Sequence, residues 1–342
     1  WVDPAGRRHE KSSRTTDKRT AERIAGKLES NAALRREGVI DARAESIGKR
    51  AQRPIAEHLH DWRESLQAKG CSPKRVKLAF GRASRIASEC AFATLAQVDP
   101  APVHRLVREM QGSEAAPRTI NAHLQAFKQF IRWAVAERRL AANPLLSVGS
   151  VKVIGQTRER RPLSPDEFVQ LIDTSRGGPI LKRMTGPDRA MLYLVAVGSG
   201  FRANELASLN PRSFDLTGDP PTITVQAAYS KRRRDDVQPI RQDLADALEP
   251  WLKGKSPENP VFSMPSKLPP MLRADMRRAK ATWIRGANDR AERYDRHKSD
   301  FLAYIDGYGR VVDFHALRST YITMLVKGGA SVKEAQQLAR HS

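Results

Sequence analysis

Two short stretches of the chain carry arginines in a setting suited to binding a phosphodiester. Residues 200–206 read GFRANEL, and residues 315–318, much later in the chain, read HALR. A guanidinium group donates two parallel hydrogen bonds, which match two nonbridging phosphate oxygens better than the point charge of a lysine does. Arg202 and Arg318 are therefore candidates to hold one phosphate together, with His315 beside them.

A spacing of three residues joins each arginine to a second polar side chain. On one helix face, Arg202 would lie beside Glu205, and His315 would lie beside Arg318. Glu205 could then orient the Arg202 guanidinium from behind while that group holds phosphate. A plain surface ion pair is the competing interpretation, and the sequence leaves both open.

A strongly basic segment, YSKRRRDD at residues 229–236, lies between two expected strands. Lys231 stands at its start, where a flexible ammonium group could protonate a departing 5′ oxygen as a general acid. The arginines that follow are expected to contact DNA phosphates from the tip of a hairpin; they are Arg232, Arg233 and Arg234. A solvated run of charge is the alternative for the segment.

Composition predicts a polyanionic partner, and double-stranded DNA fits best. The 342 residues include 60 lysines and arginines against 38 acidic residues, which gives a formal net charge of +22. The basic excess occurs in every part of the chain, interleaved with periodic apolar residues. That pattern favours folded domains around nucleic acid over a protein with one basic tail.

Several classes of protein are excluded by cysteine content and hydropathy. Cys71 and Cys90 are the only cysteines, and no Cys/His cluster has metal-ligand spacing, so neither disulfides nor a metal site are expected. No apolar run reaches the length of a membrane span, and no secretory leader opens the chain. We expect a cytoplasmic protein with no membrane partner and no cofactor.

The first two of three regions are predicted to be helical. In residues 1–53, a basic helix should run from about Asp17 to Glu37, followed by a loose linker over residues 38–53. Residues 54–150 repeat apolar residues at helical spacing and predict a separate helical domain. Its clearest helix opens at Pro117.

The third region, residues 158–342, mixes helices and short strands. Residues 158–162 are expected to form a structureless basic joint, after which Ser164 and Glu167 form a helix-start box. The patterns predict short strands at residues 222–226 and 236–240, and one long helix at residues 272–293. The expected fold is mainly α with a small antiparallel sheet.

The order of these motifs resembles the tyrosine recombinase and phage integrase family. Residues 54–342 follow its sequence of a helical domain, R-x-x-E-L, a hairpin lysine, H-x-L-R and a late histidine, here His341. The resemblance implies a helical core-binding (SAM-like) domain and an α+β catalytic domain. Residues 1–53 look like the remnant of an arm-type DNA-binding domain with its linker helix.

The resemblance also implies a reaction that needs neither metal nor cofactor. A tyrosine would attack the scissile phosphate to form a 3′-phosphotyrosyl intermediate, and a tetramer on DNA would integrate or excise a mobile element. Arg202 and Arg318 would stabilise the transition state. His315 would assist proton transfer, Lys231 would protonate the leaving oxygen, and His341 would donate a hydrogen bond to phosphate.

The family's nucleophile is not found at its expected place, because it follows the late histidine and only Ser342 follows His341 here. We interpret the sequence as a catalytic domain trimmed at its C-terminus, which would be inactive as given. Tyr321 lies one helical turn from Arg318, but its place in the family pattern is a packing position. The alternative is a non-catalytic DNA-binding regulator or a degenerate integrase remnant.

Base recognition is expected from the helix that opens at Pro117. Most contacts with the duplex should go to phosphates, while a few side chains read bases in the major groove. The candidates for base reading are Arg118, Asn121 and Lys128.

Overall fold

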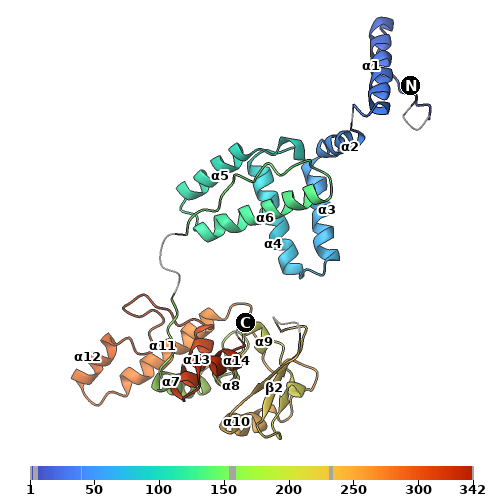
Figure 1. The fold of residues 1–342 in the computed structure, drawn as a ribbon. Coiled ribbons are helices and arrows are strands. Elements are labelled where there is room, and N and C mark those ends of the chain that lie inside the picture. The colour runs from blue at the N-terminus through green and yellow to red at the C-terminus, as the bar shows by residue number, and fades with distance from the viewer. Residues whose placement is uncertain (1, 3–6, 40, 154–158, 231–233, 341–342) are drawn as a thin grey trace. The chain divides into compact units, whose positions relative to one another are not determined.

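A computed structural model describes residues 2, 7–39, 41–153, 159–230 and 234–340. The chain divides into two compact units, residues 1–155 and residues 156–342. Most of both units is helical, and a single small antiparallel sheet lies in the second (Figure 1). The predicted fold class is therefore confirmed. No helix in the described ranges is both long enough and apolar enough to cross a membrane.

Unit 1 is built from helices alone apart from short turns and bridges. Its core lies where α4 and α6 pack on each other and on α3, around the fully buried rings of Phe127 and Phe130 and the nearly buried Trp62. Each such side chain stabilises the fold by about 1.5–3 kcal/mol. The helices are α1 (Lys18–Arg36), α2 (Ala42–Ala51), α3 (Ile55–Ala68), α4 (Pro73–Glu89), α5 (Pro100–Gly112) and α6 (Pro117–Ala136).

The prediction of a loose linker over residues 38–53 is wrong, because α2 occupies most of it. Asp41 caps this helix by accepting a hydrogen bond of 2.8 Å from the Arg43 backbone. Arg35 of α1 donates two hydrogen bonds to Glu45 of α2. Among the described side chains of this helix, Ala51 joins the buried core and Ile47 is half-buried, so apolar periodicity gave too little signal to predict it.

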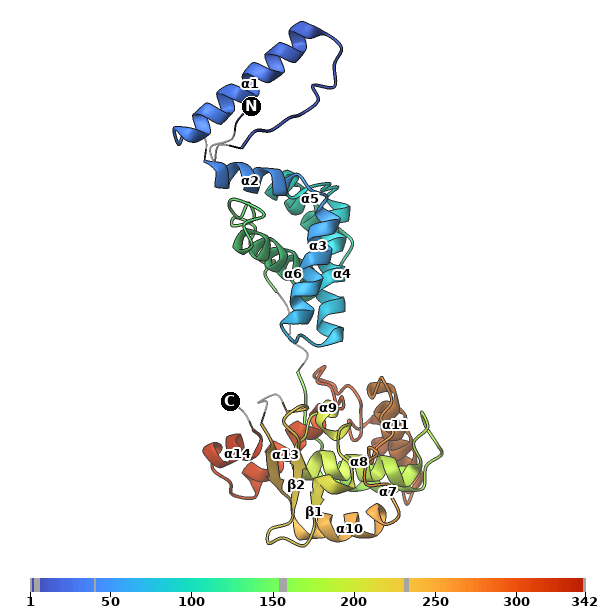
Figure 2. The ribbon, with the colours of Figure 1, turned by 90° about the vertical axis from the view of Figure 1, so that its right-hand side faces the viewer.

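Unit 2 has a three-stranded sheet beside its helices (Figure 1 and Figure 2). The strand order is β1-β2-β3, with Thr224 opposite Val237. The strands are β1 (Phe214–Asp215), β2 (Thr222–Val225) and β3 (Asp236–Pro239). The helices are α7 (Pro165–Arg176), α8 (Gly186–Ser199), α9 (Ala203–Leu206), α10 (Gln242–Leu252), α11 (Pro269–Arg285), α12 (Arg290–Lys298), α13 (Ala316–Lys327) and α14 (Val332–Leu338).

Two local predictions in unit 2 are corrected. The expected single helix at residues 272–293 is two helices. Helix α11 ends at Arg285, followed by Gly286, and Asp289 caps α12 by accepting a hydrogen bond from the Glu292 backbone. The joint before Pro162 is not structureless in its described part, since Arg160 forms a β-bridge with Val311. The Ser164–Glu167 capping box of α7 is confirmed.

Helix α8 forms the centre of unit 2 and positions the candidate site. It packs against α7, α10 and α13, and its buried Arg189 pairs with Asp275 of α11 at 2.8 Å. The helix ends at Gly200, whose φ of 65° is left-handed, and a Cβ there would lie 2.4 Å from the Tyr321 ring. This tight turn brings Arg202 and α13 together.

Candidate active site

Glu205 holds Arg202 at the start of α9. Its side chain accepts hydrogen bonds from the Arg202 backbone at 2.8 Å and from Arg202 Nη1 at 2.9 Å. The Glu205 side chain is 2% exposed, whereas that of Arg202 is 31% exposed. The pair is therefore not a plain surface ion pair, because a buried carboxylate fixes a guanidinium group that still reaches solvent.

Arg318 approaches the same place from α13. Its guanidinium is buried and donates hydrogen bonds to the carbonyl groups of Gly200 and Ala339, at the ends of α8 and α14. Burial, followed by the charges of Arg202 and Arg340, lowers the pKa of Arg318 to about 10. Arg318 remains charged near neutral pH, and the negative charge of Glu205 does not balance the positive charges around it.

Arg340 is a third arginine of this cluster, which the sequence analysis did not single out. Its Nη2 donates to Glu205 at 3.0 Å, its Nη1 lies 3.9 Å from Asp236, and its guanidinium lies over the Phe201 ring. Among the described residues, its buried Nε and Nη1 have no hydrogen-bond partner. Only its place beside His341 hinted at a role, because its partner Glu205 is remote in sequence.

His315 is the exposed residue that immediately precedes α13. Asp313 accepts hydrogen bonds from the backbone of His315 at 3.0 Å and of Ala316 at 3.2 Å, which fixes the beginning of the helix. Partial desolvation by the surrounding protein, then the charges of Arg160 and Arg318, lower the pKa of His315. A neutral imidazole near pH 7 is the form that can accept a proton.

Tyr321 is buried in unit 2, against the turn that ends α8. Its hydroxyl accepts a hydrogen bond of 2.9 Å from Gln238, and its ring packs against Gly200. Burial raises the pKa of Tyr321, which opposes formation of a nucleophilic phenolate. These contacts support the packing role that the family pattern implies.

Some predicted residues cannot be placed. Lys231, Arg232, Arg233 and His341 lie outside the described residues, so their predicted roles stay predictions. Arg234 is described and exposed, beside β3, where Asp235 accepts a hydrogen bond from the Ala227 backbone. No group of three or more His, Cys, Asp or Glu residues in the described ranges could hold a metal ion.

In unit 1 the candidate base readers have different surroundings. Arg118 is exposed, but the Asn121 amide exchanges two hydrogen bonds of 2.8 Å with the Val151 backbone, and Lys128 binds the Val148 carbonyl. These two side chains hold the segment that follows α6. Their contacts with bases stay a prediction.

A basic hollow between α4 and α6 was not predicted from the sequence. Lys74, Arg75 and Arg82 of α4 line it together with Gln125 and Gln129 of α6. Arg75 and Arg82 are seven residues apart, a spacing of about two turns that places both on one helix face, and this signal could have been read from the sequence.

Comparisons with known proteins identify the family of the chain. The phage integrase family matches residues 161–342. Tyrosine recombinase XerC of Pelotomaculum thermopropionicum is 26% identical over 260 residues, which cover 76% of this chain and 78% of that protein. XerC of Salmonella typhi is 25% identical over 262 residues, which cover 75% of this chain and 76% of that protein.

Solved structures share the fold at lower identity. A lambda integrase dimer bound to a COC′ core site has a TM-score of 0.58 at 17% identity, covering 92% of this chain and 82% of that one. The Tn1549 transposon integrase in complex with transposon right end DNA has a TM-score of 0.58 at 15% identity, covering 84% and 92%. With the family match extending over more than half of its length, the chain belongs to the phage integrase family of tyrosine recombinases.

Proposed function

We propose that this chain cleaves and rejoins DNA strands through a 3′-phosphotyrosyl intermediate, as part of a site-specific recombinase that integrates or excises a mobile element. One observation carries the proposal: the guanidinium groups of Arg202, Arg318 and Arg340 gather around Glu205, with Asp236 farther away. Among the described residues, these three cations against two carboxylates leave a net positive charge. A phosphodiester would supply the missing negative charge.

The contacts suggest how the arginines share the work. Among the described residues, Glu205 accepts from the Arg202 side chain only through Nη1. The Nε and Nη2 groups of Arg202 are therefore available to bind nonbridging oxygens. Arg318 is held by two carbonyl groups and would meet the same phosphate without moving. Preorganised cations of this kind stabilise the charge that develops in a pentavalent transition state.

The remaining roles follow the family resemblance. His315, held in its neutral form, would exchange a proton with the attacking tyrosine. Lys231 would protonate the leaving 5′ oxygen, and His341 would donate a hydrogen bond to phosphate. In this proposal the nucleophile is a tyrosine that follows His341, since the Tyr321 hydroxyl is buried against Gln238.

Duplex DNA would be held by both units, in the cytoplasm or nucleoid. The basic hollow of unit 1, with Lys74, Arg75 and Arg82, is suited to backbone phosphates. Lambda integrase has been solved as a dimer on a core site and as a tetramer on a Holliday junction. By analogy, we expect four copies of this chain to assemble on recombining DNA.

The decisive experiment is a covalent trapping assay. The chain, extended C-terminally by its native sequence, is incubated with nicked suicide DNA from its own element's ends, and a denaturing gel reports a protein–DNA adduct. We expect an adduct that Arg318→Ala abolishes and Tyr321→Phe preserves. Salt-sensitive binding without any adduct would instead favour the regulator or remnant.

A further inference from the structure

The first described residues of unit 2 are fastened beside the segment that leads to His315. Arg160 forms a β-bridge with Val311, two residues before Asp313. Val311 donates a backbone hydrogen bond of 2.8 Å to Glu159, and Arg161 donates one of 3.3 Å to Val311. The backbone on both sides of Arg160 is thereby tied to the strand-like segment before α13.

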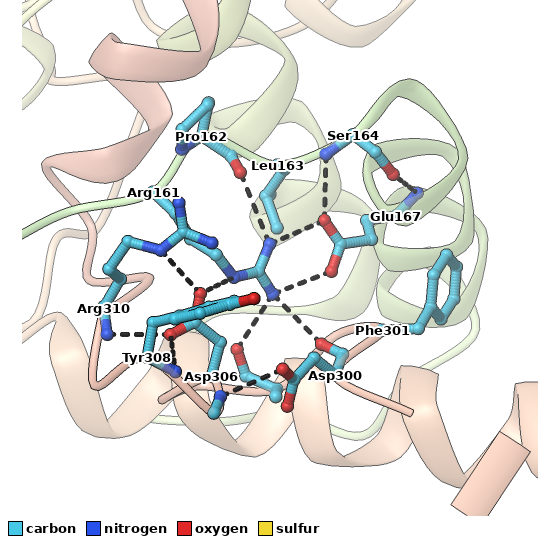
Figure 3. Close-up of polar contacts among 12 residues, drawn as sticks. Arg161, Pro162, Leu163, Ser164, Glu167, Asp300, Phe301, Asp306, Tyr308 and Arg310 are labelled. Atoms are coloured by element: carbon cyan, nitrogen blue, oxygen red, sulfur yellow. Dashed lines mark hydrogen bonds and ion pairs between the residues drawn. The ribbon is translucent and has the colours of Figure 1, made fainter. Parts of the chain in front are cut away.

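The neighbouring side chain of Arg161 anchors this segment deeply. Its guanidinium donates two hydrogen bonds of 2.8 Å to Glu167 and others to the carbonyls of Asp300 and Ala303 (Figure 3). The Arg161 side chain is 11% exposed, and Asp306 approaches it at 3.8 Å. A buried bidentate pair fixes the backbone at Arg161, so the backbone of the neighbouring Arg160 is held in place as well.

The Arg160 side chain binds the carboxylate of Asp313, which lies just before α13. Its Nε donates to Asp313 Oδ1 at 2.9 Å and to Oδ2 at 3.0 Å. Asp313 Oδ1 also accepts from the backbone of His315 at 3.0 Å and of Ala316 at 3.2 Å. One carboxylate therefore joins Arg160 to the backbone of His315, the candidate residue for proton transfer.

We propose that Arg160 is a positioning residue for His315: through Asp313, it fixes the first turn of α13 and the place of the imidazole for proton transfer. The inference rests on the strand-transfer function proposed above. It assigns a role in the site to the basic joint that leads into unit 2, a segment that no motif of the family resemblance includes.

Electrostatics support the same assignment. Arg202, Arg318 and Arg160 all present positive charge to His315, and Asp313 is the negative group that opposes them. Arg160 lowers the pKa of His315 in two ways: its charge repels a proton on the ring, and it neutralises Asp313, which would attract that proton. Its side chain is 38% exposed, so the ion pair should add little to folding stability. The expected effect of losing it is therefore on His315 and not on the fold.

The chain offers a matched control for this pair. Arg310 donates to Asp306 at 2.9 Å, and its side chain is 39% exposed, so it resembles Arg160 in partner, distance and exposure. Asp306 lies 3.8 Å from Arg161 and accepts hydrogen bonds from the backbone of Tyr308 and Arg310 (Figure 3). Arg310→Gln removes an equivalent ion pair without touching Asp313.

The test follows the His315 ring by NMR in histidine-labelled protein, with His315→Gln to assign the signal. Arg160→Gln should raise the titration midpoint of His315 and speed amide exchange at His315 and Ala316. Arg160→Lys should restore most of the midpoint, because it keeps the charge. Arg310→Gln should leave both readouts as in the parent chain.

Cleavage of suicide DNA at several pH values provides the second readout, with the parent chain and its variants all extended C-terminally by the native sequence. Because a higher midpoint leaves fewer neutral rings, Arg160→Gln should lower the rate at pH 6, by at most about fourfold if the midpoint returns to the ordinary histidine value of about 6.5, and hardly at all at pH 8. Equal midpoints in Arg160→Gln and Arg310→Gln would overturn the proposal, and so would a shifted midpoint without a matching shift in the cleavage profile. Failure of the parent chain to cleave would refute the proposed function. The NMR titration would still test whether Arg160 acts on His315 through Asp313.

Discussion

Arg340 and Glu205, far apart in sequence, are joined by a buried hydrogen bond of 3.0 Å between Nη2 and Oε2. The same carboxylate holds Arg202 from the other side. Glu205 is thus the common anion of two guanidinium groups, one that reaches solvent and one that is buried. Its charge decides how much positive potential remains for a bound phosphate.

Glu205→Gln should destabilise unit 2 and increase its response to anions. Removing one partner of a buried ion pair leaves cations uncompensated, so we expect the free energy of unfolding to fall by about 3 kcal/mol. Added phosphate should recover part of that loss, because an anion can replace the carboxylate. Urea unfolding with and without phosphate measures both effects.

The control for that variant is Glu258→Gln. Glu258 pairs with Arg212 at 2.7 Å, but both side chains are about 70% exposed. The free energy of unfolding should change by no more than about 0.5 kcal/mol. A similar loss in both variants would show that Glu205 does not act as a buried counterion.

Arg340 occupies a backbone conformation that glycine prefers, since its φ is 52° just after α14. Ala91, Glu114 and Arg138 also have positive φ, so the conformation alone is ordinary. Arg340→Gly and Arg340→Ala remove the same charge, but only glycine relieves the left-handed strain. We expect the glycine variant to be about 1 kcal/mol more stable than the alanine variant by urea unfolding.

Both Arg340 variants should nevertheless lose cleavage activity to a similar extent, because the buried cation is gone in each. Arg340→Lys should retain part of the activity. If the glycine variant cleaved DNA as well as the parent chain, Arg340 would be only a helix-ending residue.

The stability of unit 1 should depend on the protonation of His58. This side chain is buried, with Nε2 3.0 Å from the Arg50 carbonyl, and burial, with the charge of Arg139 added, lowers the pKa of His58. The unfolded chain then binds a proton at higher pH than the folded chain. The stabilising contribution is complete above the ordinary histidine pKa of about 6.5 and is lost as pH falls through it toward the folded value.

Unfolding of the full chain between pH 5 and 8 tests this dependence. His58→Gln should be less sensitive to acid than the parent chain across that window. His60→Gln, which removes an exposed imidazole from the same helix, is the matched control. An unchanged acid response in His58→Gln would refute the assignment.

Sequence reasoning predicted those features whose cause is local. The Ser164–Glu167 box and the Arg202–Glu205 spacing depend on residues three apart, and both occur in the structure. The contacts of Arg340 with Glu205 and of Arg160 with Asp313 join segments that are remote in sequence, so residue spacing could not predict them. Helix α2 was not predicted because its apolar contact is small: Ala51 joins the core, and the bond from Arg35 to Glu45 comes from a remote residue.

The basic hollow of unit 1 yields a prediction about salt dependence. Each lysine or arginine that contacts a DNA phosphate releases condensed counterions, so its loss should reduce the slope of log K against log salt by about one. Lys74→Ala and Arg75→Ala should each show this reduction, because both exposed side chains line the hollow between α4 and α6.

Arg85→Ala is the control on the same helix. Arg85 pairs with Glu89 at 2.7 Å and does not line the hollow, so the substitution removes an equal charge from a different place. Fluorescence anisotropy with duplex DNA from about 50 to 200 mM salt covers the range in which counterion release dominates affinity. Equal slopes for Arg75→Ala and Arg85→Ala would mean that net charge, and not this hollow, drives binding.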